Sequence, residues 1–227
     1  MREARCYQNS GNPFIFDFLG PEDRRILDVG CGSGDNAALI LSRYPDARVC
    51  GITVSEREKK LASGIMESCW LADVETGEPD FLGDLRFDRL LFCHVLEHFK
   101  DPGSVLEKFI PYLKPGGKIL ILVPNAAFWK QRMKFLFGDI AYEDEGIMDR
   151  THVRLFTFRN LEDVLSLSSI PRLKPVRKKA DGSAPLWKLR RLLPSGFRRT
   201  ADRAATDLWP NLFGYQIALE CFLAETP

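Results

Sequence analysis

The feature that most constrains this chain is an apolar run that ends in three glycines at alternate positions, Ile26–Gly34. Glycine adopts positive φ angles without steric cost and lets the backbone approach a ligand closely. A strand that leads into such a loop and then into a helix is typical of an open α/β sheet, where ligands bind at the carboxyl ends of the strands. We therefore expect a ligand at the end of a strand over residues 25–29. The alternative is a tight strand–helix turn without a ligand.

The segments around this loop predict a parallel sheet. Strand-like and helix-like runs alternate over the first 125 residues, which indicates strands joined by crossover helices. Further strands are expected over residues 47–53, 68–72, 87–93 and 118–123, and helices over residues 36–43, 56–66 and 102–112. After Pro124 the alternation stops. Residues 126–137 and 160–167 then predict helices, and residues 214–223 predict a last strand.

Composition and charge restrict the class of protein. The formal net charge is +1, so the overall charge does not by itself indicate nucleic acid or a membrane as a partner. The six cysteines contain no CxxC pair, and no apolar run reaches the roughly 18 residues of a membrane span or the form of a signal peptide. We expect a cytoplasmic protein with reduced thiols and no nucleic-acid partner.

One segment is strongly basic. Residues 172–203 hold eleven Lys and Arg against two Asp. Leu186, Leu189 and Leu193 recur there at helical spacing, which is compatible with a basic amphipathic helix on a membrane surface. The charges are equally compatible with attraction of a phosphate-bearing molecule or with a solvated face. These three interpretations stay open.

The glycine spacing separates two ligand classes. A dinucleotide fingerprint would read GxGxxG, but position 35 is Asp, so that spacing fails. The GxGxG form with Asp28 before it resembles motif I of the class I S-adenosylmethionine (SAM) methyltransferases. SAM carries no phosphate, and its amino-acid end needs backbone groups and a carboxylate for its ammonium.

Further segments extend the resemblance in the same order. Gly51–Ser55, Asp73-Val74, Cys93–His98 and Leu113–Gly117 look like the later motifs of the small-molecule class I enzymes. The VLEH and LKPGG stretches resemble the group that includes ubiquinone-biosynthesis O-methyltransferases. The resemblance covers roughly residues 7–167 and the last strand.

The resemblance implies a fold and a division of the chain. The fold class would be α/β: a Rossmann-like, doubly wound, mostly parallel seven-stranded sheet with helices on both faces and a C-terminal lid or insertion. Residues 1–227 would form a single methyltransferase domain with its core at about 22–125. Segments at about 126–157 and 180–212 would form the acceptor site and lid, before the final strand at about 214–223.

SAM is the cofactor that the resemblance implies. The residues expected to bind it are Asp28, Gly30, Cys31, Gly32, Gly34, Thr53, Val54, Asp73, Val74, Cys93 and His94. Thr53 departs from the family, where an acidic residue usually holds both ribose hydroxyls. Thr53 can make one such contact, and Glu56 is the residue expected to supply another. The GITxS form also resembles the cyclopropane-fatty-acid and sterol methyltransferases, so Thr53 does not indicate an inactive site.

The segment after the fifth strand narrows the expected substrate. Several segments are similar to bacterial methyltransferases linked to glycosyltransferases and cell-envelope sugars: Val123–Asn125, Trp129, Gly138, Gly146-Ile147, Asp149–His152 and Arg154–Thr157. They also resemble a protein that works with methionine-biosynthesis acyltransferases. We predict transfer of a methyl group to a small molecule, such as a hydroxyl of a sugar or secondary metabolite. The residues expected to contact this acceptor are Asn125, Phe128, Tyr142 and Arg154.

A hydroxyl acceptor needs a base, most often His or a carboxylate. His152, with Asp149 close by, is the predicted base or polar anchor; the alternative is a loop histidine that binds backbone. In the ubiquinone O-methyltransferases, a related ExxEH stretch is associated with a divalent cation. Here His94 replaces the first Glu of that stretch, so we predict that no metal is needed. Two rival functions are a non-catalytic SAM-binding partner of another enzyme and a nicotinamide oxidoreductase.

Overall fold

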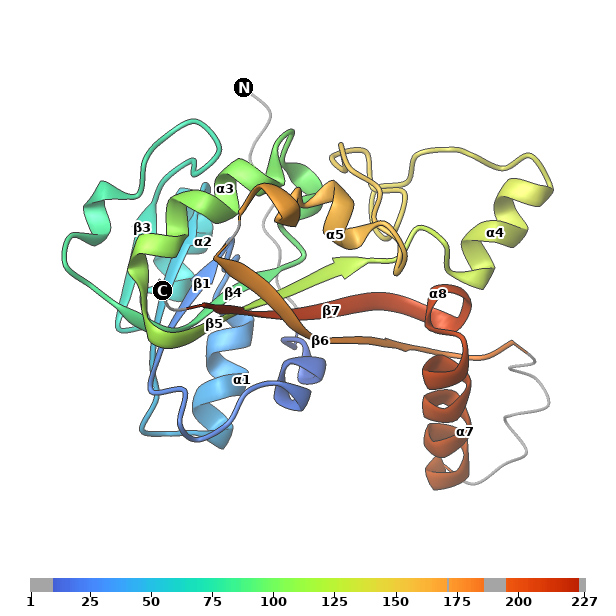
Figure 1. Cartoon of the computed structure of the whole chain (residues 1–227), viewed down its shortest axis with the longest axis horizontal. Helices are drawn as coiled ribbons and strands as arrows, with labels where there is room; N and C mark the ends of the chain where they lie inside the picture. Colours follow the sequence, from blue (N-terminus) through green and yellow to red (C-terminus); the bar gives the residue numbers. More distant parts are fainter. Residues whose placement is uncertain (1–9, 171, 186–194, 225–227) are drawn as a thin grey trace.

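The computed structural model describes residues 10–170, 172–185 and 195–224. Within them a seven-stranded sheet has the order β3-β2-β1-β4-β5-β7-β6. The strands are β1 (Arg25–Val29), β2 (Arg48–Thr53), β3 (Ser68–Leu71), β4 (Phe87–Cys93), β5 (Leu113–Pro124), β6 (Leu173–Gly182) and β7 (Gly214–Leu223). The first five pair in parallel, whereas β7 runs antiparallel to both β5 and β6. The predicted fold class is confirmed (Figure 1).

Helices cover both faces of this sheet. The helices are α1 (Asp35–Arg43), α2 (Glu56–Ala62), α3 (Pro102–Phe109), α4 (Trp129–Leu136), α5 (Leu161–Val164), α7 (Ser195–Leu208) and α8 (Pro210–Phe213). One buried cluster joins α3 and α5 to the sheet, and a second joins α1, α2 and the 3-10 turn Pro13–Asp17 to its other face. Figure 1 shows α3 and α5 above the sheet and α1 below it.

The apolar strands explain why these layers form. Residues Leu90, Leu91 and Phe92 of β4 are fully buried, because the central strand is covered from both sides. Strand β5 begins earlier than predicted, at Leu113. Its Leu113 pairs with Phe87 and its Lys118 with Arg89, so the residues between them, including Gly116-Gly117, form a bulge.

The C-terminal part differs most from the prediction. Strand β6 was not expected, and its last residues lie inside the segment 180–212 that was predicted to be a lid. It forms the edge of the sheet, where Lys174 and Arg177 are exposed, Lys178 and Lys179 form ion pairs, and no apolar alternation is needed. Residues 195–213 then form α7 and α8. The predicted basic helix at residues 186–194 lies outside the described residues.

Four predicted helices are shorter in the structure. The α-helices expected at 56–66 and 102–112 end at Ala62 and Phe109. The helix expected at 126–137 begins at Trp129, and the one expected at 160–167 contains only Leu161–Val164 before a left-handed residue, Ser166, at φ 50°. Among the described residues, no helix has the length and apolar composition to cross a bilayer.

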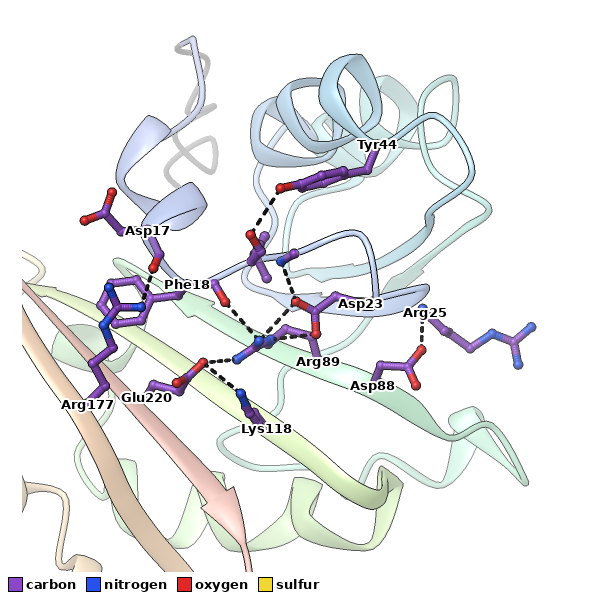
Figure 2. A network of polar contacts seen from close by, with 12 residues as sticks. Asp17, Phe18, Asp23, Arg25, Tyr44, Asp88, Arg89, Lys118, Arg177 and Glu220 are labelled. Carbon is purple, nitrogen blue, oxygen red and sulfur yellow. Dashed lines mark hydrogen bonds and ion pairs between the residues drawn. The ribbon is translucent and has the colours of Figure 1, made fainter.

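A buried ion network ties the N-terminal turn to the sheet. Arg89 of β4 is 1% exposed, and its guanidinium donates to Asp23 at 3.0 and 3.1 Å, to Glu220 of β7 at 2.6 Å and to the Phe18 carbonyl at 3.0 Å. Figure 2 shows these groups converging on one arginine from three parts of the chain. The network fixes the segment that precedes β1 against the centre of the sheet.

Candidate functional site

The glycine loop lies at the carboxyl end of β1, as the sequence predicts. Gly30, Gly32 and Gly34 have φ angles of 77°, 53° and 88°, which other residues rarely adopt. A Cβ atom on Gly30 would lie 2.5 Å from Cγ2 of Val95, so no side chain fits there. The amides of Gly30 and Cys31 donate to the Ile52 carbonyl at 2.9 Å, which holds the loop against the end of β2.

Asp28 supplies a buried carboxylate just below this loop. Its side chain is 0% exposed, Asn36 donates to Oδ2 at 3.5 Å, and Oδ1 has no hydrogen-bond partner in the structure. Burial raises the pKa of Asp28 from 3.8 to about 7, and the bond from Asn36 opposes this shift. A buried acceptor without a donor fits the binding of a cationic group, such as the ammonium of SAM.

The end of β2 carries a second carboxylate, which the sequence analysis missed. Thr53 is buried, and its hydroxyl donates to Oε2 of Glu58 at 2.6 Å. Glu58 lies in the first turn of α2 and is itself buried, whereas the predicted Glu56 is exposed. Ser55 caps this helix and accepts from the Glu58 amide at 3.4 Å. The Ser-x-x-Glu spacing of a capping box was the signal for Glu58 in the sequence.

The other predicted cofactor residues lie at neighbouring strand ends. Val54 and Asp73 are exposed after β2 and β3, whereas Val74 and Cys93 are buried. Cys31 is also buried, within the glycine loop. The fold therefore brings the predicted residues to one edge of the sheet, and their contacts with a cofactor stay a prediction.

His94 follows β4 and has an unusual conformation. Its φ is 53°, in the left-handed region where a residue other than glycine is strained, and such residues cluster at functional sites. Its Nε2 lies 3.1 Å from Oε1 of Gln216, and its Nδ1 lies 3.5 Å from Oε1 of Glu97. Burial lowers the pKa of His94, but the contacts with Glu97 and Gln216 outweigh it and raise the pKa above its ordinary value.

Glu97 connects His94 to the predicted base. Its side chain is 1% exposed, Oε2 has no hydrogen-bond partner, and Oε1 lies 3.9 Å from Nε2 of His152. The Nδ1 atom of His152 lies 3.0 Å from the Ile147 carbonyl, and this acceptor places the proton of a neutral imidazole on Nδ1. Glu97 was not among the predicted site residues, and its position between two histidines was not expected from the sequence.

The loop that carries His152 is held to the 3-10 turn after β4. The amides of Val153 and Arg154 donate to the Glu97 carbonyl at 2.9 and 3.1 Å. Asp149 is buried and accepts from the amide and hydroxyl of Thr151 at 2.8 and 2.7 Å. In this structure Asp149 therefore shapes the loop, and its predicted part in catalysis is untested.

The residues predicted to contact the acceptor are in different surroundings. Asn125 is fully buried, donates to the carbonyls of Asn211 and Gly214, and accepts from the amide of Ala127. Phe128 is buried, Tyr142 is exposed, and Arg154 donates to the Lys100 carbonyl at 2.9 Å. Asn125 thus ties β5 to the start of β7, and acceptor contacts of all four residues stay predictions.

Three side chains of metal-binding types lie together in this region. Glu97, His98 and His152 each place one possible ligand atom within 4.8 Å of the others. The rings of His98 and His152 also pack edge to face, with centroids 4.8 Å apart. The arrangement could hold a divalent ion. The prediction that the protein needs no metal is untested.

A metal analysis would test this expectation. Protein purified without added metal should contain well below one divalent metal ion per chain, magnesium included, because His94 interrupts the acidic stretch. A chelator should then leave the thermal unfolding midpoint unchanged. The prediction would be contradicted if wild-type protein contained one metal ion per chain that the chelator removes, and if a His98→Ala variant did not bind that ion.

Comparison with known proteins identifies a methyltransferase domain in this chain. A sequence profile described as "Methyltransferase domain" matches residues 8–167. A trans-aconitate 2-methyltransferase from Azoarcus sp. is 31% identical over 102 residues, which cover 44% of this chain and 39% of that protein. A ubiquinone biosynthesis O-methyltransferase from Idiomarina loihiensis is 31% identical over 141 residues, or 58% and 56% of the two chains. The chain thus spans about half or less of the length of the curated relatives it matches.

Solved structures support the fold. The plantazolicin methyltransferase BpumL, in complex with SAH, superposes with a TM-score of 0.57 at 20% identity, covering 89% of this chain and 77% of that one. A SAM-dependent methyltransferase from Archaeoglobus fulgidus gives a TM-score of 0.56 at 19% identity, covering 88% and 86%. At this identity the likeness concerns the fold alone.

Proposed function

Because this chain belongs to the methyltransferase domain family, we propose that it transfers a methyl group from SAM to a small-molecule acceptor. The observation that carries the proposal is the carboxyl end of β1, where a positive-φ glycine loop lies above a buried carboxylate with a free acceptor atom. SAM would supply an activated methyl group as a sulfonium. The chain then has to bind this donor, align the acceptor and exclude water.

The residues divide this work by position. Asp28 and the loop Gly30–Gly34 would bind the amino-acid end of SAM. At the end of β2, Thr53 would face the ribose with Glu58 behind it, since the Thr53 hydroxyl already donates to that carboxylate. The Thr53 oxygen also accepts from the Ser55 amide at 3.3 Å, which leaves its second lone pair as an acceptor for a ribose hydroxyl.

The binding part of the proposal has a direct test. Calorimetry with SAM and NAD side by side should show binding of SAM alone, and NAD binding would favour the oxidoreductase. Incubation with labelled SAM and extract of the native host, followed by mass identification, should yield a labelled small molecule. Tight SAM binding without any labelled product would favour the non-catalytic partner.

We propose a hydroxyl oxygen as the methylated atom and His152 as the base that accepts its proton. The carbonyl of Ile147 leaves Nε2 as the unprotonated nitrogen, which is the form that a base needs. We also propose that the acceptor carries a phosphate or a sugar, or lies at a membrane surface. This proposal is supported by the basic charges of β6 and α7.

A second candidate for the base is His94. Its side chain is 36% exposed, against 8% for His152, so an acceptor reaches it more easily. Glu97 lies next to both rings and can stabilise a positive charge on either. The two candidates make different predictions for variants.

Exchange of His152 for asparagine should lower turnover by about 10²–10⁴-fold, the usual contribution of a general base. The dissociation constant of SAM should stay nearly unchanged, because His152 lies outside the glycine loop. His94→Asn should affect turnover less and SAM binding more. Loss of turnover in His94→Asn with full turnover in His152→Asn would move the base to His94.

A further inference from the structure

Two cysteines from distant parts of the sequence meet beside the glycine loop. Cys31 lies between Gly30 and Gly32, and Cys69 lies on β3. Their Sγ atoms are 3.9 Å apart. In the sheet Asp28 pairs with Gly51, and Gly51 pairs with Cys69, so the Cys31 side chain reaches across β2 to meet β3.

Gly51 makes this meeting possible. A Cβ atom at position 51 would lie 2.6 Å from Sγ of Cys31, closer than real contacts allow. The missing side chain on the middle strand therefore opens the space that the Cys31 sulfur occupies. The pair depends on the packing of three strands and is more than a chance proximity on the surface.

The two thiols differ in access and in acidity. Cys69 is partly exposed, whereas Cys31 is 6% exposed. The hydrogen bond from Cys31 and the charge of Lys59 lower the pKa of Cys69, although burial opposes them. The bond to Cys69 and burial raise the pKa of Cys31. Cys69 therefore forms the thiolate more readily, and thiolates are the nucleophiles in thiol–disulfide exchange.

We propose that Cys31 and Cys69 form a reversible disulfide that weakens cofactor binding, with a low-molecular-weight disulfide as the oxidant. The Cys69 thiolate attacks one sulfur of the oxidant and releases one small thiol. Cys31 then loses its proton and attacks the Cys69 sulfur, which now carries the other half of the oxidant, so that the Cys31–Cys69 bond forms and the second small thiol leaves. Two protein thiols are oxidised, and the oxidant is reduced to two thiols.

The effect on the cofactor follows from the geometry of the loop. A disulfide brings the sulfurs to about 2.05 Å, so they must approach by roughly 1.9 Å. Cys69 is held in a strand, whereas Cys31 is part of the loop, so the loop carries most of the movement. The hydrogen bonds that the backbone amides of Gly30 and Cys31 donate to the Ile52 carbonyl would shift with the loop. This step rests on the proposed function, because it takes the loop as the SAM site.

The experiment treats the purified full chain with oxidised glutathione. Wild-type protein should lose two hydrogens in mass, and peptide mapping should find Cys31 linked to Cys69. Calorimetry should then show SAM affinity lowered by at least about tenfold, a change of about 1.4 kcal/mol. Dithiothreitol should restore both the mass and the affinity.

Two variants separate the parts of the inference. Cys69→Ser should bind SAM like the reduced wild type and should keep this affinity after oxidation. Cys221→Ser, in buried strand β7, should oxidise like the wild type. Wild-type protein that stays folded after oxidation but has no Cys31–Cys69 disulfide would overturn the proposal. A disulfide that forms without a loss of SAM affinity would overturn the proposed effect on the cofactor. Reduced protein that does not bind SAM would contradict the proposed function, while the mass still tests the disulfide.

Discussion

Replacing Arg89 with alanine is expected to lower the free energy of unfolding by about 3–5 kcal/mol, the usual cost of breaking a buried ion pair from one side. The guanidinium pairs with both Asp23 and Glu220, which are buried. Without it two carboxylates stay in the interior, Asp23 with the Gly20 amide at 3.0 Å and Glu220 with Lys118 at 3.8 Å. Since small domains are stable by roughly 5–15 kcal/mol, this loss is a large part of the total.

Urea denaturation of the two proteins measures this effect. Arg86→Ala is the matched control, because Arg86 lies three residues away on the surface, where it donates to the carbonyls of Gly83 and Leu85 and lies 5.7 Å from the centre of the Tyr112 ring. It should change stability by no more than about 0.5 kcal/mol. A neutral set of Arg89→Met, Asp23→Asn and Glu220→Gln should recover most of the loss. A loss below about 1 kcal/mol in Arg89→Ala would show that the network shown in Figure 2 contributes little.

The first five strands could be predicted because local apolar patterns determine them. Residues 87–93 form β4 at the predicted bounds, since the apolar run Leu90–Cys93 within them is buried from both faces. Strand β6 could not be predicted in this way. Its stability comes from backbone pairing with β7 at the edge of the sheet, and its side chains carry charge instead of an apolar pattern.

The glycine loop of the candidate site could be predicted from the sequence, but the side chains that contact the predicted residues could not. The glycine spacing alone placed Gly30 and Asp28 at the end of β1. The contacts of Thr53 with Glu58, and of Glu97 with His94 and His152, depend on how a helix and a distant loop pack against the strand ends. Arg89 likewise meets Glu220 across 131 positions of sequence, which no local pattern encodes.

Exchange of Asp28 for asparagine should weaken SAM binding by at least about 100-fold. Removal of one member of a buried charge pair costs about 2–5 kcal/mol, and the partner here is the cationic cofactor. Calorimetry measures this change directly. Asp88→Asn is the matched control, because Asp88 lies in β4 and binds the Arg25 amide and Lys114, near the start of β1. Equal losses in both variants would remove Asp28 from the site.

The pH dependence gives Asp28 a second and independent signature. The pKa of Asp28 is about 7 in the folded chain, above its ordinary value of 3.8 in an unfolded chain, so folding favours the protonated form. The stability it contributes is complete below about pH 4 and is lost as pH rises through about 7. Wild-type protein without SAM should therefore lose stability relative to Asp28→Asn over this range. A bound cation favours the carboxylate, so wild-type affinity for SAM should rise from pH 6 to 8, and a flat profile would contradict direct contact between Asp28 and the cofactor's charge.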